Sequence, residues 1–322
     1  MAAAQDQPRS ALFARAAALR ALTPYLHCAN ALTLCQRSKW DGEQAMVRIA
    51  AIGDNVVDCY VSSGLMYPGG NTLNVSAFAQ RFGANAAYVG VVGDDPAGRH
   101  IIASLRSEGV DVSHLRIERG ATAYCIIGHD NGDRVFVRFD LGVSMFAPTA
   151  GDLQFLAEFD AAHVGRSSGL DPYLAEIKAR TKLSYDFSTR RDIDHIAEVA
   201  PGCFLAACSG GDLSDSDADA LQRSVLDAGA EWVLVTKGQR GASITNGAYV
   251  YTVPAVPVSV VDTLGAGDTF TARTLVGLIR NEAPADLLYA AAEEAAKTCL
   301  YAGAIGHGIP VDIGIPVPEL TA

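Results

Sequence analysis

The chain has 322 residues, of which 49% are hydrophobic and 19% are charged, so it contains enough apolar sequence to bury one large core. Its net charge of -11 argues against nucleic acid as a partner, because proteins that wrap a polyanion need clustered lysine and arginine. No apolar run reaches the roughly 20 residues that span a bilayer, and the seven cysteines form neither a CxxC pair nor a zinc spacing. We therefore expect a cytoplasmic protein with reduced thiols and no membrane partner.

Residues 1–45 differ in composition from the rest of the chain. They could form an amphipathic helix, and their arginine and alanine content suggests a transit peptide, although Asp6, Asp41 and Glu43 argue against one. Met46 stands directly before the strand-like run RIAAIG. We interpret 1–45 as an N-terminal extension or a misassigned start, 46–315 as one domain, and 316–322 as a tail.

Short β-branched runs alternate with helical patterns after Met46. The runs that read as buried strands are RIAAIG, AAYVGVV, FDAAHV, KLSYDF, CFLAAC and EWVLVT. The segments between them, such as TLNVSAFAQRFG, AGRHIIASLRSEG and DADALQRSVLDAG, have the periodicity of amphipathic helices. This alternation predicts an α/β fold with a doubly wound, mostly parallel sheet flanked by helices, whose ligands lie at the carboxyl ends of the strands.

One stretch departs from this alternation. Residues 121–141 contain two strand-like runs around Asn131-Gly132, a pair that suits the positive φ angles of a tight hairpin turn. We expect a small β lid built from this hairpin and a further strand near 60–68. Such a lid would cover a pocket or form a homodimer surface, and the alternative is an edge hairpin with neither role.

Two carboxylates flank a glycine turn in the segment DTLGAGDTF, residues 262–270. The surrounding sequence predicts a strand, a turn and then a helix that begins near Gly267. The amides of Gly265, Ala266 and Gly267 would lie at a helix N-terminus, where unpaired N–H groups attract an anion. Asp268 would then be placed to accept a proton from an attacking hydroxyl, and Asp262 would bind a cation or brace the loop. The simpler alternative is that Asp268 only caps the helix.

The segments PGGNTLNVSAFAQRFGANAAYVGVVGDDPAG and VDTLGAGDTFTA lie about 190 residues apart. They resemble the two signatures of the ribokinase and phosphofructokinase B family of carbohydrate kinases, and the resemblance covers the chain from about Arg48 to Pro310. It implies a ribokinase-like fold, ATP and Mg2+ as cofactors and, in many relatives, a monovalent cation such as K+. It also implies in-line phosphoryl transfer to a primary hydroxyl of a sugar, with Asp268 as the base and Gly265 to Gly267 as the anion hole.

Further positions acquire roles from the same resemblance. Asp262 belongs to the loop where many relatives bind the monovalent cation. One group of residues matches positions that line the sugar pocket of relatives. These residues are Asp58, Gly69, Gly70, Asn71 and Asn74.

The segment TKGQRG matches the nucleotide-binding segment of the family. This match implies that ATP is bound by Thr236, Lys237, Gly238, Gln239 and Gly241. The segment DFSTR resembles a family pattern with Asn in place of Ser188, in which Arg190 contacts a phosphate and the role of Asp186 stays open. Relatives often carry Asn-x-x-Glu near the magnesium ion, whereas this chain has Ser209-Gly-Gly-Asp212. Asp212 would hold Mg2+ through a water, but the missing Asn leaves that assignment open.

Within the family, the pieces GDN, GGN and HDNGDRVF resemble the fructoselysine 6-kinase branch. This resemblance implies a fructosamine substrate, while 2-keto-3-deoxygluconate, fructose or ribose remain alternatives. Arg138 would meet a substrate carboxylate if its side chain points under the lid. The residues expected to set the choice of substrate are Asp54, Asn55, Arg138 and Arg166.

Two other functions fit parts of the sequence. Residues 165–169 match the G-x-S-x-G elbow of serine hydrolases, with Ser167 as nucleophile and His307 later in the chain, but this function leaves DTLGAGDTF unexplained. A sugar- or nucleotide-sensing protein that kept the fold and lost the chemistry is the second alternative. We expect structural roles for His129 and His163.

Overall fold

The computed structural model describes residues 46–130 and 133–314. The predicted extension 1–45, the Asn131-Gly132 turn and the predicted tail 316–322 lie outside these described residues. The described residues form two sheets and two layers of helices, which agrees with the predicted α/β fold.

The larger sheet has nine strands within the described residues, in the order β13-β12-β11-β10-β9-β8-β1-β4-β5. Neighbouring strands from β11 to β5 run parallel, and β12 and β13 add an antiparallel edge. Each of the six predicted buried runs forms one of the parallel strands. The nine strands of the larger sheet are β1 (Arg48–Ile52), β4 (Asn85–Gly93), β5 (Leu115–Glu118), β8 (Ala161–Gly165), β9 (Lys182–Asp186), β10 (Cys203–Ser209), β11 (Trp232–Thr236), β12 (Ala242–Thr245) and β13 (Val250–Val253).

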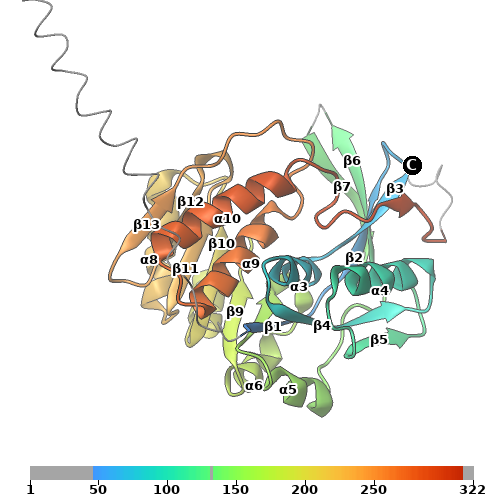
Figure 1. Cartoon of the computed structure of the whole chain (residues 1–322), viewed down its shortest axis with the longest axis horizontal. Helices are drawn as coiled ribbons and strands as arrows, with labels where there is room; N and C mark the ends of the chain where they lie inside the picture. Colours follow the sequence, from blue (N-terminus) through green and yellow to red (C-terminus); the bar gives the residue numbers. More distant parts are fainter. Residues whose placement is uncertain (1–45, 131–132, 315–322) are drawn as a thin grey trace, which may run out of the picture. The chain divides into compact units, whose positions relative to one another are not determined.

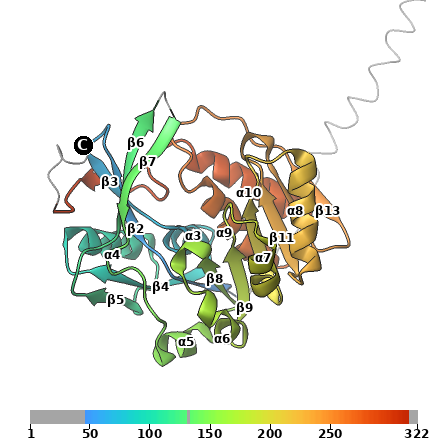
Figure 2. The ribbon, with the colours of Figure 1, turned by 180° about the vertical axis from the view of Figure 1, so that it is seen from behind.

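Helices cover both faces of this sheet, as Figures 1 and 2 show from opposite sides. Successive side chains of a strand point to opposite faces, so Ile49 and Ala51 pack against one layer, and Ala50 and Ile52 against the other. The first layer contains α3 (Asn71–Arg81), α4 (Pro96–Glu108), α9 (Ala266–Ile279) and α10 (Pro284–Thr298). The second contains α5 (Ala150–Leu156), α6 (Leu174–Lys178), α7 (Ile193–Val199) and α8 (Asp215–Asp227). Short 3-10 turns are η1 (Arg166–Ser168), η2 (Asp171–Tyr173) and η3 (Gly238–Arg240).

The smaller sheet has the strand order β14-β3-β2-β6-β7, and it lies beside α3 and α4 in both views (Figures 1 and 2). Its strands are β2 (Val56–Tyr60), β3 (Leu65–Gly69), β6 (Tyr124–Asp130), β7 (Asp133–Asp140) and β14 (Ile309–Pro310). Strands β6 and β7 form the predicted antiparallel hairpin. The structure differs from the single strand predicted near 60–68, because the chain reverses at 61–64. Gly64 permits this turn with a φ of +65°, and its amide donates to the Tyr60 carbonyl.

The segment before α9 also differs from the prediction. Residues 254–265 contain no strand in the described chain, although VPVSVV was expected to form one. Pro254 and Pro257 lack the amide hydrogen that a sheet ladder requires. Val260 and Val261 are 56% and 64% exposed, so this apolar run is not buried as a core strand would be.

Cys59, Cys203, Cys208 and Cys299 carry free thiols. Cys59, Cys203 and Cys208 are buried, whereas Cys125 and Cys299 are half-buried. Burial raises the pKa of the Cys203 thiol to about 11, so it stays protonated at neutral pH. Among the described residues, no helix is both long enough and apolar enough to cross a membrane.

Candidate active site

Asp268 lies where the carboxyl ends of the central strands meet the N-termini of α3 and α9. Helix α3 begins directly after Gly69 and Gly70. Gly70 has a φ of 105°, and a Cβ atom there would lie only 2.8 Å from the Asn55 Cα, so the turn requires glycine. Asn71 and Asn74 follow in the first turn of α3, three residues apart on one face of the helix.

Both oxygens of the Asp268 carboxylate accept hydrogen bonds from these asparagines. Asn71 Nδ2 donates to Oδ1 over 2.8 Å, and Asn74 Nδ2 donates to Oδ2 over 2.7 Å. Asn71 Nδ2 also donates to Asp186 Oδ2 over 2.8 Å, at the end of β9. Two carboxylates therefore share one amide group, and neither has a cation as a partner among these contacts.

The electrostatics of this cluster favour protonation of both acids. Burial raises the pKa of Asp268 to about 7, and the nearby Asp186 and Asp54 add to this effect, although the hydrogen bonds from Asn74 and Asn71 oppose it. Burial also raises the pKa of Asp186 to about 6, against the bonds from the Ser188 amide and Asn71. A carboxylate with a pKa near neutrality is suited to accept a proton during a reaction.

The helix N-terminus next to Asp268 is open to an anion. Gly265 precedes α9 with a φ of 79°, and a Cβ atom there would lie 2.4 Å from the Ala304 Cβ. A Cβ atom on Gly267 would meet nothing within 4 Å, and that residue is exposed. The Ala266 amide donates to the Thr263 carbonyl over 3.3 Å, whereas the amides of Gly265, Gly267 and Asp268 meet no acceptor within the described residues. The amides of Gly265, Gly267 and Asp268 could therefore bind an anion, whereas the Ala266 amide is already engaged.

The predicted sugar-pocket residues gather beside this cluster. Asp58 is buried on β2 and faces Gly69, where a Cβ atom would lie 2.0 Å from the Asp58 Oδ2. Asn55 Nδ2 donates to the Val91 carbonyl over 2.8 Å, but Asn55 Oδ1 is buried without a partner in the described chain. Asn74 Oδ1 is in the same situation. Two buried acceptors without donors suit the hydroxyl groups of a ligand.

The residues expected to set the choice of substrate occupy different environments. Asp54 accepts hydrogen bonds from the Ser167 and Ser168 hydroxyls over 3.0 and 2.9 Å. Arg166 is half-buried in η1, and its Nε atom has no partner among the described residues. Arg138 is exposed on β7, opposite Ile126 of β6, and the described contacts do not bring it to the Asp268 cluster.

The predicted nucleotide segment follows β11 at the same edge of the sheet. Thr236 ends β11, and Gly238 and Gln239 form η3. Lys237 is largely covered and its Nζ lies 3.2 Å from the Asp215 carboxylate. A Cβ atom on Gly241 would lie 1.9 Å from the Val253 carbonyl oxygen, so glycine is needed there.

The candidate phosphate and metal residues are engaged in ion pairs and loop contacts. Arg190 pairs with Asp192 at the surface. Asp212 has both oxygens paired with Arg191, at 2.9 and 2.5 Å, so it is not free to hold a hydrated metal ion as it stands. Asp262 accepts from the Leu264 and Gly303 amides, each over 3.0 Å, and from the Tyr60 hydroxyl. These contacts make Asp262 a brace of its loop.

Comparison with known proteins bears on this geometry. Residues 44–311 match the model of the pfkB family of carbohydrate kinases. This chain belongs to the pfkB family. It is 38% identical over 272 residues to fructosamine kinase FrlD of Bacillus subtilis (strain 168), which covers 82% of this chain and 95% of the relative. It is 32% identical over 261 residues to fructoselysine 6-kinase of Escherichia coli (strain K12), which covers 80% of this chain and all of the relative.

The fold of this carbohydrate kinase has a counterpart among solved structures. A putative ribokinase II of E. coli, in complex with ATP and Mg2+, superposes with a TM-score of 0.69 and 20% identity, covering 86% of this chain and 98% of that one. The predicted ribokinase-like fold is thus confirmed. The family and the kinase relatives establish an ATP-dependent sugar or fructosamine kinase.

Some contacts around the Asp268 cluster were not predicted from the sequence. His163, for which a structural role was expected, has its Nε2 atom 3.0 Å from the Asn71 Oδ1. Arg191, rather than Arg190, faces the Ser209 carbonyl and Asp212. A histidine inside the apolar run AAHVG, where a strand ends at the ligand edge, is the sequence signal that points to His163.

The hydrolase alternative does not form the contacts it requires. Ser167 donates to Asp54, and no histidine bonds to Ser167 within the described residues. His307 instead contacts Glu108 at the end of α4 over 2.5 Å. A nucleophilic serine needs a base within hydrogen-bond reach, so the G-x-S-x-G match of the kinase has no catalytic support.

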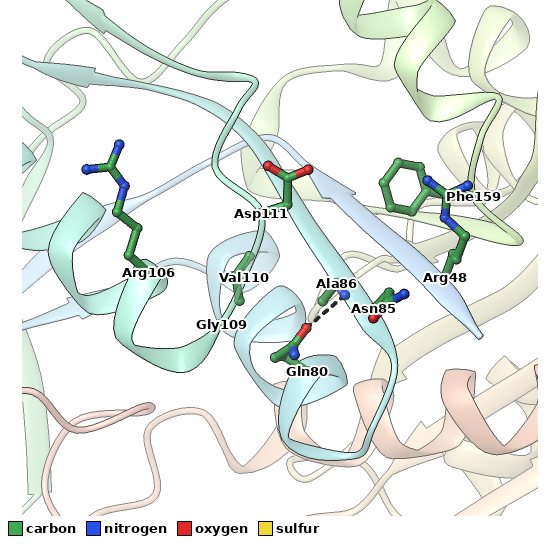
Figure 3. Close-up of a pocket in the computed structure, with 9 residues that line it drawn as sticks. All are labelled: Arg48, Gln80, Asn85, Ala86, Arg106, Gly109, Val110, Asp111 and Phe159. Carbon is green, nitrogen blue, oxygen red and sulfur yellow. Dashed lines mark hydrogen bonds between the residues drawn. The ribbon is translucent and has the colours of Figure 1, made fainter. Parts of the chain in front are cut away.

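A surface pocket of about 400 Å³ lies at the opposite edge of the kinase (Figure 3). It includes Arg48 and Asn85, where β1 and β4 begin. Gln80 crosses this pocket to accept a hydrogen bond from the Ala86 amide over 2.9 Å (Figure 3). Because ligands of doubly wound sheets bind at the carboxyl ends of the strands, the cluster around Asp268, and not this pocket, is the candidate active site.

Proposed function

We propose that this kinase transfers the γ-phosphoryl group of ATP to the primary hydroxyl of a fructosamine, with Asp268 as the catalytic base. The observation that carries this proposal is the Asp268 carboxylate, held by two asparagine amides beside the open N-terminus of α9. The choice of a fructosamine is supported by the similarity to fructosamine kinase FrlD. Asp268 as a mere helix cap is a poorer explanation, because its oxygens accept from α3 side chains and not from its own helix.

The residues around the transferred group would have separate tasks. As the substrate oxygen bonds to the γ-phosphorus and the bond to the bridging oxygen of ADP breaks, Asp268 takes up the hydroxyl proton. The amides of Gly265 and Gly267 would stabilise charge on the transferring phosphoryl group. Because the pKa of Asp268 is about 7, a large fraction of this base is ionised at neutral pH.

Mg2+ would reach the site with the nucleotide. The described residues contain no group of three acidic, histidine or cysteine ligands that could hold a metal ion. This fits an ion that binds through phosphates and keeps several waters. Asp212 would contact such a water only after its pair with Arg191 opens. We also propose that a monovalent cation such as K+ binds by the loop that Asp262 braces, through backbone carbonyls.

On the substrate side, the sugar would bind Asp58, Asn55 and Asn74. The two buried oxygens of the asparagines would each accept a hydroxyl hydrogen, and Asp58 would accept others. A fructosamine derived from an amino acid also carries a carboxylate. Arg166 would bind this carboxylate, since its buried Nε has no partner in the described chain, and Arg138 would approach it only if β7 moves inward.

The test is ATP consumption by the purified protein with Mg2+ and K+. The panel contains fructoselysine, other fructosamines, fructose, ribose and 2-keto-3-deoxygluconate. We expect selective turnover of a fructosamine, and a loss of about 10² to 10⁴ in kcat for Asp268→Asn, the range for removal of a general base. Ser167→Ala is the matched control and should retain turnover.

The alternatives correspond to other outcomes of this panel. Turnover of a plain sugar would contradict the fructosamine assignment and keep Asp268 as the base. Near-normal turnover by Asp268→Asn would contradict the mechanism. No turnover with ATP still bound would favour a sugar or nucleotide sensor.

We further propose that the smaller sheet acts as a lid and pairs with a second copy to form a homodimer. Val137 and Phe139, two residues apart on one face of β7, are 52% and 69% exposed, and a second copy could cover them. Light scattering during size-exclusion chromatography should give a molar mass twice that of the monomer. The Phe139→Lys variant should give a molar mass closer to that of the monomer. The free thiols of Cys59, Cys203, Cys208 and Cys299 fit the reducing environment of the cytoplasm, where we propose that the kinase works.

A further inference from the structure

We propose that His163 is a positioning residue that keeps the Asn71 amide turned so that Asn71 donates to Asp268. This role rests on the proposed function of Asp268 as the base. His163 touches neither the carboxylate nor the expected position of the substrate, and it acts through Asn71.

The contacts of His163 place it behind the catalytic cluster. Its side chain is fully buried at β8, beside Ser184 of the neighbouring strand β9, with which it is in register. His163 Nε2 lies 3.0 Å from Asn71 Oδ1, and Nδ1 lies 2.9 Å from Ser184 Oγ. On the other side, a Cβ atom on Gly165 would lie 2.3 Å from Asn71 Oδ1, so the absence of a side chain at 165 makes room for the asparagine.

The hydrogen-bond network assigns one tautomer to His163. Asn71 Nδ2 uses its hydrogens on Asp268 and Asp186, so the Asn71 oxygen faces the imidazole and requires a donor. His163 must therefore carry its hydrogen on Nε2, and the Ser184 hydroxyl donates to Nδ1. Burial lowers the pKa of His163 to about 3, so the ring stays neutral throughout the working pH range.

A fixed donor at this position matters because the acids next to Asn71 change protonation near neutral pH. Asp268, Asp186 and Asp54 are the titratable groups that act on this cluster. When Asp268 or Asp186 is protonated, its O–H could donate to a reversed Asn71 amide, and Asp268 would then no longer accept from Asn71. The His163 N–H opposes this reversal, because it would face the Asn71 NH2 group. His163 thereby favours the ionised, proton-accepting form of Asp268.

Two substitutions at His163 separate this role from simple packing. His163→Gln can place an amide N–H near the former Nε2 position, whereas His163→Asn reaches only the Nδ1 position and leaves Asn71 without its donor. We expect kcat to fall about tenfold in His163→Asn, the effect of one lost hydrogen bond, with KM for the sugar within about twofold. The acidic limb of the kcat–pH profile should move up by about one pH unit. His163→Gln should stay within about threefold of the wild type in kcat.

A spectroscopic measurement on the wild-type protein tests the same network without a variant. Nitrogen-15 spectra of the imidazole side chains, with His163 assigned by its absence in His163→Gln, should show the Nε2–H tautomer unchanged from pH 5 to pH 9. If His163→Asn does not fold, Ser184→Ala replaces it, and we expect partial conversion to the Nδ1–H tautomer with a lower kcat.

Three results would overturn the role of His163. They are equal losses of kcat in His163→Gln and His163→Asn at unchanged melting temperature, an Nδ1–H tautomer in the wild type, or an unaltered tautomer and kcat in Ser184→Ala. A failure of the proposed function is distinguishable, because it would appear as near-normal turnover in Asp268→Asn whatever the state of His163.

Discussion

Replacement of Asp268 by asparagine is expected to stabilise the folded protein at neutral and alkaline pH. Burial raises the pKa of this carboxyl from 3.8 to about 7, so the folded state holds the proton more tightly than the unfolded state. The wild-type protein therefore loses stability as the pH rises through this interval. At about 1.36 kcal/mol per pKa unit, the rise in the pKa corresponds to a loss of about 4 kcal/mol in the free energy of unfolding once Asp268 is ionised. Asparagine does not ionise, so the variant avoids this loss.

The hydrogen bonds at this position can adapt to the substitution. Asparagine at 268 would turn an NH2 group toward one of its two present donors. Asn74 can reverse its own amide to accept from that group, because Asn74 Oδ1 has no partner to lose among the described residues. We therefore expect most of the gain to appear in the measured free energy of unfolding.

Urea unfolding at pH 5 and pH 8 measures this gain. We expect Asp268→Asn to exceed the wild type by about 4 kcal/mol at pH 8 and by less than about 2 kcal/mol at pH 5, while kcat falls as described above. The exposed Asp219 of α8 provides a control, since Asp219→Asn should change the free energy of unfolding by less than about 0.5 kcal/mol. An equal gain at both pH values, or no gain at pH 8, would refute the conclusion that the ionised carboxylate destabilises the fold.

The site geometry leads to further expectations. Gly265→Ala should lower the free energy of unfolding by more than about 2 kcal/mol, because its φ of 79° and the nearby chain exclude a Cβ atom. Gly267→Ala should leave the free energy of unfolding unchanged or raise it by up to about 1 kcal/mol. The same change should increase KM for ATP, because the new methyl group would project from an open helix end. A stable variant with unchanged KM would show that the phosphate binds elsewhere. The kcat–pH profile should rise through about pH 7 as Asp268 loses its proton, and a profile that is flat between pH 5 and pH 8 would contradict that assignment. Tyr60→Phe should raise the K+ concentration needed for half-maximal turnover, because Asp262 loses one of its donors; an unchanged K+ response would separate this contact from cation binding.

Much of the fold could be predicted because its determinants are local. The run around Ile49 is apolar at successive positions, which is what a strand covered on both faces requires, whereas the edge strand β5, with the sequence LRIE, lacks this signal and was not predicted. The two glycine-containing signatures also identify the two helix N-termini that meet at Asp268. Sequence reasoning failed at 254–265, where apolar residues suggested a strand but two prolines prevent pairing, and at 61–64, where one strand was expected instead of a turn.

The parts of the site that could not be predicted depend on contacts between distant positions. His163 and Asn71 are 92 residues apart in the chain, and their contact exists only because β8 ends next to the start of α3. Arg191 and Arg190 are neighbours in sequence with the same chemistry, so no local pattern tells which one faces Asp212. The raised pKa of Asp268 likewise arises from its burial between elements that are distant in sequence, with a smaller contribution from Asp186 and Asp54.

Strand β2 contacts two of the segments that the proposed mechanism uses. Asp58 packs against Gly69, just before α3, and Tyr60, two residues later, donates to Asp262 in the loop before α9. If the sugar binds at Asp58 as proposed, a shift of this strand on sugar binding would also move the loop next to the proposed phosphate site. Thermodynamic reciprocity then demands that the factor by which sugar tightens ADP binding equals the factor by which ADP tightens sugar binding. A kinase whose two sites are coupled in this way would also hydrolyse ATP slowly until the sugar acceptor has bound.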